Sequence, residues 1–249
     1  MPYALRTRFK KEIVTEFLPP RGRDTGKVII FCSGMPSVPA KREFLEFYSK
    51  KGFWTFAPRY RGTWESGGKF LARSPHEDIL DIIDELPRGF ISFFDGKRYR
   101  VKPKRLYIFG SSFGGPAALL CSRDPRVTKI VAASGVIEWR AQQKTKETQP
   151  RLEKFTRNAF GEAYRFRSSD WKKQGRGNFY NPASYAKEIE GKKVLLFHAQ
   201  DDDVVPWQPT QKFAKATGAR LVLYKRGGHH VARFTKPIIY RHVRKFLAE

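Results

Sequence analysis

The sequence has little of several features that would place it in a structural class at once. Its 249 residues include two cysteines, too few for a disulfide-stabilised secreted scaffold. We expect Cys32 and Cys121 to be reduced thiols in the core of a cytoplasmic protein. The charged N-terminus does not have the pattern of a signal peptide, and no apolar run approaches the roughly 18 residues of a membrane helix. We therefore expect no membrane span.

Acidic residues are also scarce relative to basic ones. Against 49 Lys and Arg there are 24 Asp and Glu, which gives a formal net charge of +25. A basic surface could attract nucleic acid, an anionic membrane or an acidic substrate. The positive charges are spread along the chain, however, and no recognisable nucleic-acid module is present. We interpret the charge as a solvated basic surface and expect no nucleic-acid partner. A non-catalytic protein that binds polyanions is the alternative.

Strand-like and helical patterns alternate over most of the chain, whose length suits one domain with or without a cap. The apolar run at residues 27–32 is typical of a strand that is buried on both faces of a parallel sheet. Further strands are expected at residues 4–10, 13–18, 53–57, 105–109, 129–133, 194–197 and 220–224. Helices are expected at residues 40–51, from residue 74, and at 113–123, 207–217 and 233–248. This alternation predicts an α/β fold with a mostly parallel central sheet and helices on both faces.

The segment of residues 136–190 breaks the alternation and is too long for a plain connection. It carries many aromatic residues: Trp139, Phe155, Phe160, Tyr164, Phe166, Trp171, Phe179, Tyr180 and Tyr185. We expect most of them to pack in a core, and some to form a partly apolar substrate pocket. We therefore expect a helical lid or cap at residues 136–190, inserted into a core formed by residues 1–135 and 191–249.

The strongest local motif is G-S-S-F-G at residues 110–114, which fits the G-x-S-x-G pattern. It follows a buried strand and precedes a helix. Such a turn holds its serine in a strained conformation with the hydroxyl exposed, and the glycines prevent a clash of Cβ atoms. The helix also directs its N-terminal amides at developing negative charge. The motif predicts Ser112 as a catalytic nucleophile; a glycine-rich turn without catalysis is the alternative.

A serine nucleophile needs a base, and the segment K-R-G-G-H-H at residues 225–230 places two histidines between a strand and the last helix. We prefer His229 over His230 because it directly follows the two glycines. His76 and His242 are expected to be exposed to solvent.

The base in turn needs an acid, and three adjacent aspartates at residues 201–203 lie between a strand and a helix. Three neighbouring carboxylates repel one another, so their presence needs a reason. Asp203 could cap the helix, or the three could hold a cation. The order of serine, acid and histidine along the chain agrees with the α/β-hydrolase arrangement.

Together these motifs resemble the α/β-hydrolase superfamily over nearly the whole chain, and especially its prolyl-oligopeptidase-like and esterase-like catalytic domains. The family acid commonly occurs as H-G-x-x-D-x-x-V-P, and residues 198–206 match this pattern with alanine in place of glycine. The resemblance thereby implies Asp202 as the acid. Residues 60–68 are similar to the family's R-G-x-x-x-S-x-G loop.

The resemblance also implies an oxyanion hole that is formed by the backbone N–H groups of Met35 and Phe113. Most relatives have H-G in the loop after the strand at 27–32, whereas this chain has S-G-M-P at residues 33–36. Met35 is the matching donor, and Pro36 has no N–H to donate.

The function that the resemblance implies is hydrolysis of a small-molecule carboxylic ester through an acyl-enzyme intermediate, without a metal or an organic cofactor. Prolyl oligopeptidases carry an additional propeller domain, for which we see no room in 249 residues. We therefore expect an esterase rather than a peptidase. The enzymatic alternatives are a small aminopeptidase or acyl-peptide hydrolase, and acyl transfer to an alcohol or a thiol.

Overall fold

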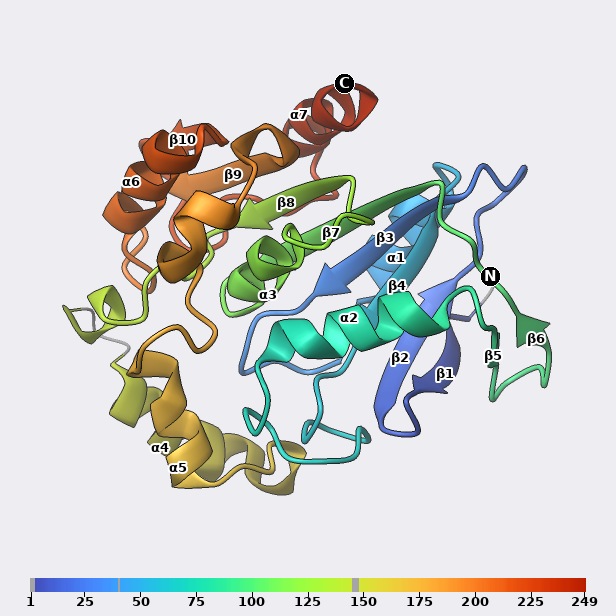
Figure 1. Cartoon of the computed structure of the whole chain (residues 1–249), viewed down its shortest axis with the longest axis horizontal. Helices are drawn as coiled ribbons and strands as arrows, with labels where there is room; N and C mark the ends of the chain where they lie inside the picture. The colour runs from blue at the N-terminus through green and yellow to red at the C-terminus, as the bar shows by residue number, and fades with distance from the viewer. Residues whose placement is uncertain (1–2, 40, 145–147) are drawn as a thin grey trace.

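The computed structural model describes residues 3–39, 41–144 and 148–249, and it contains an eight-stranded sheet with helices on both faces (Figure 1). The strand order is β1-β2-β4-β3-β7-β8-β9-β10. β2 pairs antiparallel with β1 and β4, whereas the neighbours in the series β4-β3-β7-β8-β9-β10 pair in parallel. The predicted mostly parallel α/β sheet is therefore confirmed.

The strands follow the predicted apolar runs closely. Those of the large sheet are β1 (Leu5–Phe9), β2 (Ile13–Leu18), β3 (Lys27–Cys32), β4 (Trp54–Pro58), β7 (Arg105–Ser111), β8 (Lys129–Ala133), β9 (Val194–Ala199) and β10 (Arg220–Tyr224). A separate hairpin is formed by β5 (Phe90–Ile91) and β6 (Arg98–Tyr99). Both β7 and β9 extend two residues beyond their predicted ends, toward the loops that carry Ser112 and Asp202.

The helices that cover the sheet are α1 (Arg42–Ser49), α2 (Pro75–Glu85), α3 (Gly114–Cys121), α6 (Trp207–Thr217) and α7 (Pro237–Ala248). A capping box formed by Ser74 and Glu77 is present at the start of α2. The last helix begins at Pro237 and not at the predicted residue 233. The reason is that a proline disfavours helical backbone in the residue before it, and Lys236 is extended. Residue 40 of the predicted first helix lies outside the described residues.

The core occupies both faces of the sheet. Along β7 the side chains alternate: Leu106 and Ile108 belong to one buried cluster, and Tyr107 and Phe109 belong to the other. A central strand that is buried in this way reads as a continuous apolar run, which is why the sequence identified it. Both cysteines are buried and free. Over the described part of the chain, no helix is both long and apolar enough to span a membrane.

The segment of residues 136–190 is built from short helices, and its residues 145–147 lie outside the described residues. The short helices of this segment are α4 (Gln149–Phe160), α5 (Ser168–Trp171) and the 3₁₀ helices η1 (Ala141–Lys144), η2 (Gly161–Ala163), η3 (Lys172–Gly175) and η4 (Pro182–Glu188). A further 3₁₀ turn, η5 (Gly191–Lys193), leads into β9. In Figure 1 the yellow and orange ribbon of α4 and α5 lies on the side toward which the β3 arrow points.

Backbone hydrogen bonds join this segment to the loop after β4. Trp64 N–H donates to Ala163 O at 2.8 Å, and Arg165 N–H donates to Gly62 O at 2.7 Å. Gly62 has a φ of 72°, and a Cβ there would lie 1.9 Å from Phe70 N. The glycine of the R-G-x-x-x-S-x-G loop is thus needed where two backbone segments cross closely.

Candidate active site

Ser112 occupies the sharp turn between β7 and α3. Its φ is 52°, a left-handed value that is uncommon for a residue with a side chain. Ser112 N–H donates to Ala133 O of the neighbouring strand at 2.9 Å, which anchors the turn to the sheet. The sequence predicted a strained strand-to-helix turn at this position, and the structure contains it.

The glycines of the motif allow α3 to approach the sheet closely. A Cβ on Gly114 would lie 2.0 Å from Cys32 O, and one on Gly110 would lie 2.2 Å from Gly114 O. Both contacts are with backbone atoms, which cannot move aside as a flexible side chain could. The predicted steric role of these glycines is therefore confirmed.

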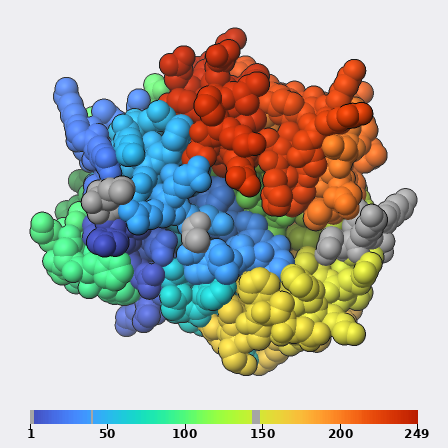
Figure 2. Space-filling view, turned by 180° about the vertical axis from the view of Figure 1, so that it is seen from behind, coloured from blue at the N-terminus to red at the C-terminus, as the bar shows by residue number. Residues whose placement is uncertain are grey.

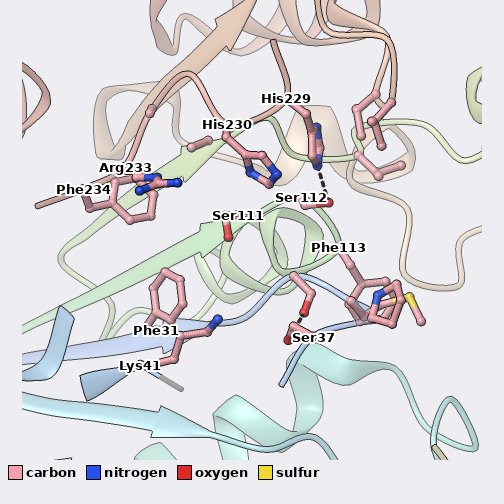
Figure 3. A pocket seen from close by; sticks show the side chains of 18 of the residues that line it. Phe31, Ser37, Lys41, Ser111, Ser112, Phe113, His229, His230, Arg233 and Phe234 are labelled. Atoms are coloured by element: carbon pink, nitrogen blue, oxygen red, sulfur yellow. Dashed lines mark hydrogen bonds between the residues drawn. The ribbon is translucent and has the colours of Figure 1, made fainter. Parts of the chain in front are cut away.

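The structure brings Ser112, His229 and Asp202 together, although the serine and the histidine are 117 positions apart in the chain. Figure 3 shows the contact between Ser112 and His229. The distance from Ser112 Oγ to His229 Nε2 is 2.9 Å, and His229 Nδ1 lies 3.1 Å and 3.0 Å from the two carboxylate oxygens of Asp202. An ionised carboxylate only accepts hydrogen bonds, so Nδ1 carries the proton and Nε2 accepts from the serine hydroxyl. In this tautomer the histidine can remove the serine proton.

The Asp202 carboxylate is buried and well supplied with donors. The N–H groups of Val204 and Val205 donate to Oδ1 at 3.0 Å and 2.9 Å. Burial raises the pKa of this carboxyl, but the hydrogen bonds from His198, His229 and Val205 outweigh burial and hold the pKa well below its usual range. Asp202 is therefore ionised at neutral pH, where it can orient His229 and stabilise its protonated form.

His198, the first residue of the H-G-x-x-D-x-x-V-P motif, also contacts this acid, a role that was not predicted from the sequence. Its side chain is fully buried, with Nε2 lying 3.2 Å from Asp202 Oδ2 and 3.1 Å from Val205 O. Both of these atoms are acceptors, so Nε2 carries a proton, and Nδ1 lies 2.9 Å from Thr210 Oγ1. The histidine four residues before the acid was the signal that could have identified it.

The neighbouring aspartates have different environments. Asp201 accepts hydrogen bonds from the N–H groups of Gly227 and Gly228 at 3.1 Å and 2.8 Å, and so holds the loop that carries His229. Asp203 is exposed. Among residues 3–39, 41–144 and 148–249, no group of three or more His, Cys, Asp or Glu side chains could hold a metal ion.

The remaining histidines lie apart from this arrangement. His230 lines the same cavity, with its ring centroid 5.3 Å from that of His229 (Figure 3). His242 is exposed, as expected. The expectation for His76 was wrong: it lies half-buried in the first turn of α2, with Nδ1 2.7 Å from Ser74 Oγ. Burial there lowers the pKa of His76 from 6.5 to about 4.

Met35 and Phe113, whose N–H groups the resemblance implied as oxyanion donors, both line the cavity beside Ser112. Within the described chain, neither N–H donates to a protein acceptor. The loop that carries Met35 is close to the nucleophile, because a Cβ on Gly34 would lie 3.2 Å from Ser112 Cβ. Two donors at this position could stabilise negative charge on a carbonyl oxygen under attack.

The cavity has a volume of about 900 Å³. The segment of residues 136–190 contributes part of its wall, through residues that include Val136, Trp139, Leu152 and Phe155. Figure 2 shows the face of the molecule where the yellow part of this segment, the red C-terminal segment and the blue N-terminal part meet. Most of the other aromatic residues of the segment 136–190 do not line this cavity. Those that are buried are Tyr164, Phe166, Trp171 and Tyr180.

A model of the prolyl oligopeptidase family matches residues 41–249. No curated protein matches the chain.

Solved structures that resemble this one include the acylaminoacyl peptidase of Pyrococcus horikoshii, with 18% identity and a TM-score of 0.70 over 100% of this chain and 41% of that one. An esterase of Pyrococcus furiosus is 18% identical with a TM-score of 0.68, over 99% of this chain and 89% of its own. Est1E from Butyrivibrio proteoclasticus is 15% identical with a TM-score of 0.63, over 99% and 100%. The chain therefore spans about two fifths of the peptidase it resembles, and its fold is that of the α/β-hydrolases.

Proposed function

Because the chain belongs to the prolyl oligopeptidase family, we propose that it is a serine hydrolase in which Ser112, His229 and Asp202 form the catalytic triad. The observation that carries the proposal is the 2.9 Å contact between Ser112 Oγ and His229 Nε2, with the Asp202 carboxylate behind Nδ1. These contacts supply a nucleophile, a base and an orienting acid in the tautomer that catalysis requires.

The first half of the reaction acylates the enzyme. His229 Nε2 takes the proton of Ser112, whose Oγ forms a bond to the substrate carbonyl carbon. The N–H groups of Met35 and Phe113 stabilise the oxyanion. The tetrahedral species collapses as the bond to the leaving group breaks, and the protonated His229 gives its proton to the departing oxygen. The products of this half are an alcohol and an ester of Ser112.

The second half returns the enzyme to its starting state. His229 takes a proton from a water molecule whose oxygen attacks the acyl carbon of the Ser112 ester. The same two amides stabilise the second oxyanion. The bond between the acyl carbon and Ser112 Oγ breaks, and His229 returns the proton to Ser112. The acid is released, and one water molecule has been consumed for each ester cleaved.

A carboxylic ester is the substrate class that we favour. An esterase of Pyrococcus furiosus resembles this chain over 89% of its own length. The cavity lining is also rich in apolar side chains, including Phe31, Phe44 and Trp139, which suit the acyl or alcohol part of an ester. Hydrolysis of acylated peptides is the second candidate, supported by the resemblance to an acylaminoacyl peptidase.

We further propose that residues 136–190 act as a lid of this site. Trp139 and Phe155 from this segment line the cavity, and Tyr180 Oη donates a hydrogen bond to Phe113 O beside the nucleophile. A cover of this kind would exclude bulk water and leave room for a small substrate.

A substrate panel tests the proposed function. We would compare p-nitrophenyl acetate, butyrate and octanoate with an N-acetyl-alanine p-nitroanilide, on wild-type protein and on Ser112→Ala. We expect turnover of at least one ester, reduced about a thousandfold or more in the variant. Turnover of the anilide without any ester would favour the peptidase. Equal rates for the folded variant and the wild type would contradict the proposal.

A further inference from the structure

Two positively charged side chains enter the cavity from different walls. Lys41 is the residue before α1, and Arg233 follows the loop that carries His229. Both line the same cavity as Ser112. In Figure 3 they lie on one side of Ser112, whereas Phe113 lies on the other. The cavity thus has a cationic side that is separate from the side of the proposed oxyanion donors.

Neither side chain has a partner among the residues that the structure describes. Within the part of the chain that the structure describes, the side chains of Lys41 and Arg233 form no ion pair, hydrogen bond or ring contact. By contrast, Arg59 and Arg61 each contact two or more carboxylates. Lys41 is also half-buried, and burial lowers its pKa. A partly desolvated ammonium without a counter-charge is unfavourable for the empty protein and favours an anionic ligand.

The other charged groups that line the cavity do not cancel this positive charge. Among the described residues that line the cavity, Glu43 is the one with a carboxylate; it is exposed and accepts a hydrogen bond from Thr235 Oγ1 at 2.7 Å. The pKa of His230 is lowered by burial and then by the neighbouring His229 and Arg233, which favours its neutral form.

We propose that Lys41 and Arg233 bind a carboxylate of the substrate, so that the preferred substrates are acidic esters such as monoesters of dicarboxylic acids. This inference rests on the ester hydrolysis proposed at Ser112. A guanidinium and an ammonium are the two side-chain groups best suited to hold a carboxylate. The large positive net charge of the protein would in addition attract such a substrate from solution.

A pair of substrates that differ in one charge tests the inference. We would compare p-nitrophenyl monoesters of succinate, glutarate and adipate with neutral p-nitrophenyl esters of matched length, as ratios of kcat/KM. We expect the wild type to prefer the acidic ester of the best length by about tenfold or more. Lys41→Gln and Arg233→Gln should each lower this ratio by about tenfold. Lys212→Gln and Arg244→Gln remove the same charges from exposed positions outside the cavity and should leave the ratio unchanged.

Charge reversal and direct binding complete the test. The double variant Lys41→Glu, Arg233→Glu should prefer the neutral ester. Glutarate should bind saturably to Ser112→Ala in ligand-observed NMR, and the additional changes Lys41→Gln and Arg233→Gln should abolish this binding. If the neutral esters are hydrolysed without any preference for the acidic ones, the carboxylate site is wrong and the hydrolase stands. If no ester is hydrolysed but glutarate binds as expected, the hydrolase is wrong and the site stands. Absence of saturable glutarate binding would overturn the inference.

Discussion

The imidazole of His198 lies against the carboxylate of Asp202, with 3.2 Å between Nε2 and Oδ2, and both side chains are buried. His229 contacts the same carboxylate from the side of the cavity. His198 is therefore a positioning residue: it reaches the reacting atoms only through Asp202.

Replacing His198 by leucine removes this donor, and we expect kcat on a p-nitrophenyl ester to fall about tenfold to a hundredfold. A hydrogen bond to a charged group contributes about 1.5–3 kcal/mol, which corresponds to such a factor. The Nε2 of glutamine can replace that of histidine, so His198→Gln should recover most of the activity. Thermal unfolding would establish that both variants are folded. Equal activity of the two variants would exclude the positioning role.

Asp202 and its neighbour Asp203 should differ sharply in their effect on activity. Asp202→Asn keeps the shape of the side chain but takes away the charge that stabilises protonated His229, and we expect kcat to fall by about a thousandfold to ten-thousandfold. Asp203 is exposed, so Asp203→Asn is the matched control and should stay within about twofold of the wild type. A large loss of activity in Asp203→Asn with little loss in Asp202→Asn would show that Asp202 is not the catalytic acid.

Gly114→Ala should destabilise the fold. The new Cβ would lie 2.0 Å from Cys32 O, so α3 or β3 must shift, at a cost on the order of 3 kcal/mol or more. Gly67 offers a control, because a Cβ there would lie 3.4 Å from the nearest atom, the Cγ of Glu12, which is an ordinary contact. Urea unfolding of the two variants compares their free energies of unfolding. Equal stabilities would show that the turn has more room than the structure indicates.

His76 should make the protein less stable in acid. Its pKa is about 4 in the folded protein, against 6.5 for an ordinary histidine, so between these values the unfolded chain binds a proton that the folded chain does not. The contribution of His76 to the free energy of unfolding is therefore highest above pH 6.5. It decreases as the pH falls from 6.5 toward 4, by about 1–3 kcal/mol in total.

Urea unfolding at pH 7 and pH 4.5 checks this sign. The loss of stability between the two pH values should be smaller in His76→Gln than in the wild type. His242→Gln, at an exposed position of α7, should behave like the wild type. An equal loss of stability in all three proteins would contradict the pKa shift of His76.

The features that could be predicted from the sequence are those that local patterns determine. The strands of the parallel sheet are continuous apolar runs, because they are buried on both faces. The turn at Ser112 was predictable because its glycines and its place between a strand and a helix follow from neighbouring residues alone.

The features that were missed depend on packing between distant segments. His76 is half-buried although its place in the chain predicted exposure; Cys121 Sγ of α3 lies 3.6 Å from His76 O, which shows how closely that helix packs against it. The role of His198 depends on the direction of its ring, which Thr210 of α6 and the backbone of Val205 determine. The cationic pair of Lys41 and Arg233 joins residues from opposite ends of the chain, and no local pattern relates them.

The most direct test of the central claim, that Ser112 is the nucleophile, is covalent labelling with a fluorophosphonate probe, read by intact mass. Ser111→Ala, which removes the adjacent hydroxyl, is the matched control for Ser112→Ala. We expect a single adduct on the wild type and on Ser111→Ala, and no adduct on Ser112→Ala. An adduct that persists in folded Ser112→Ala, or no adduct on the folded wild type, would contradict the proposed triad.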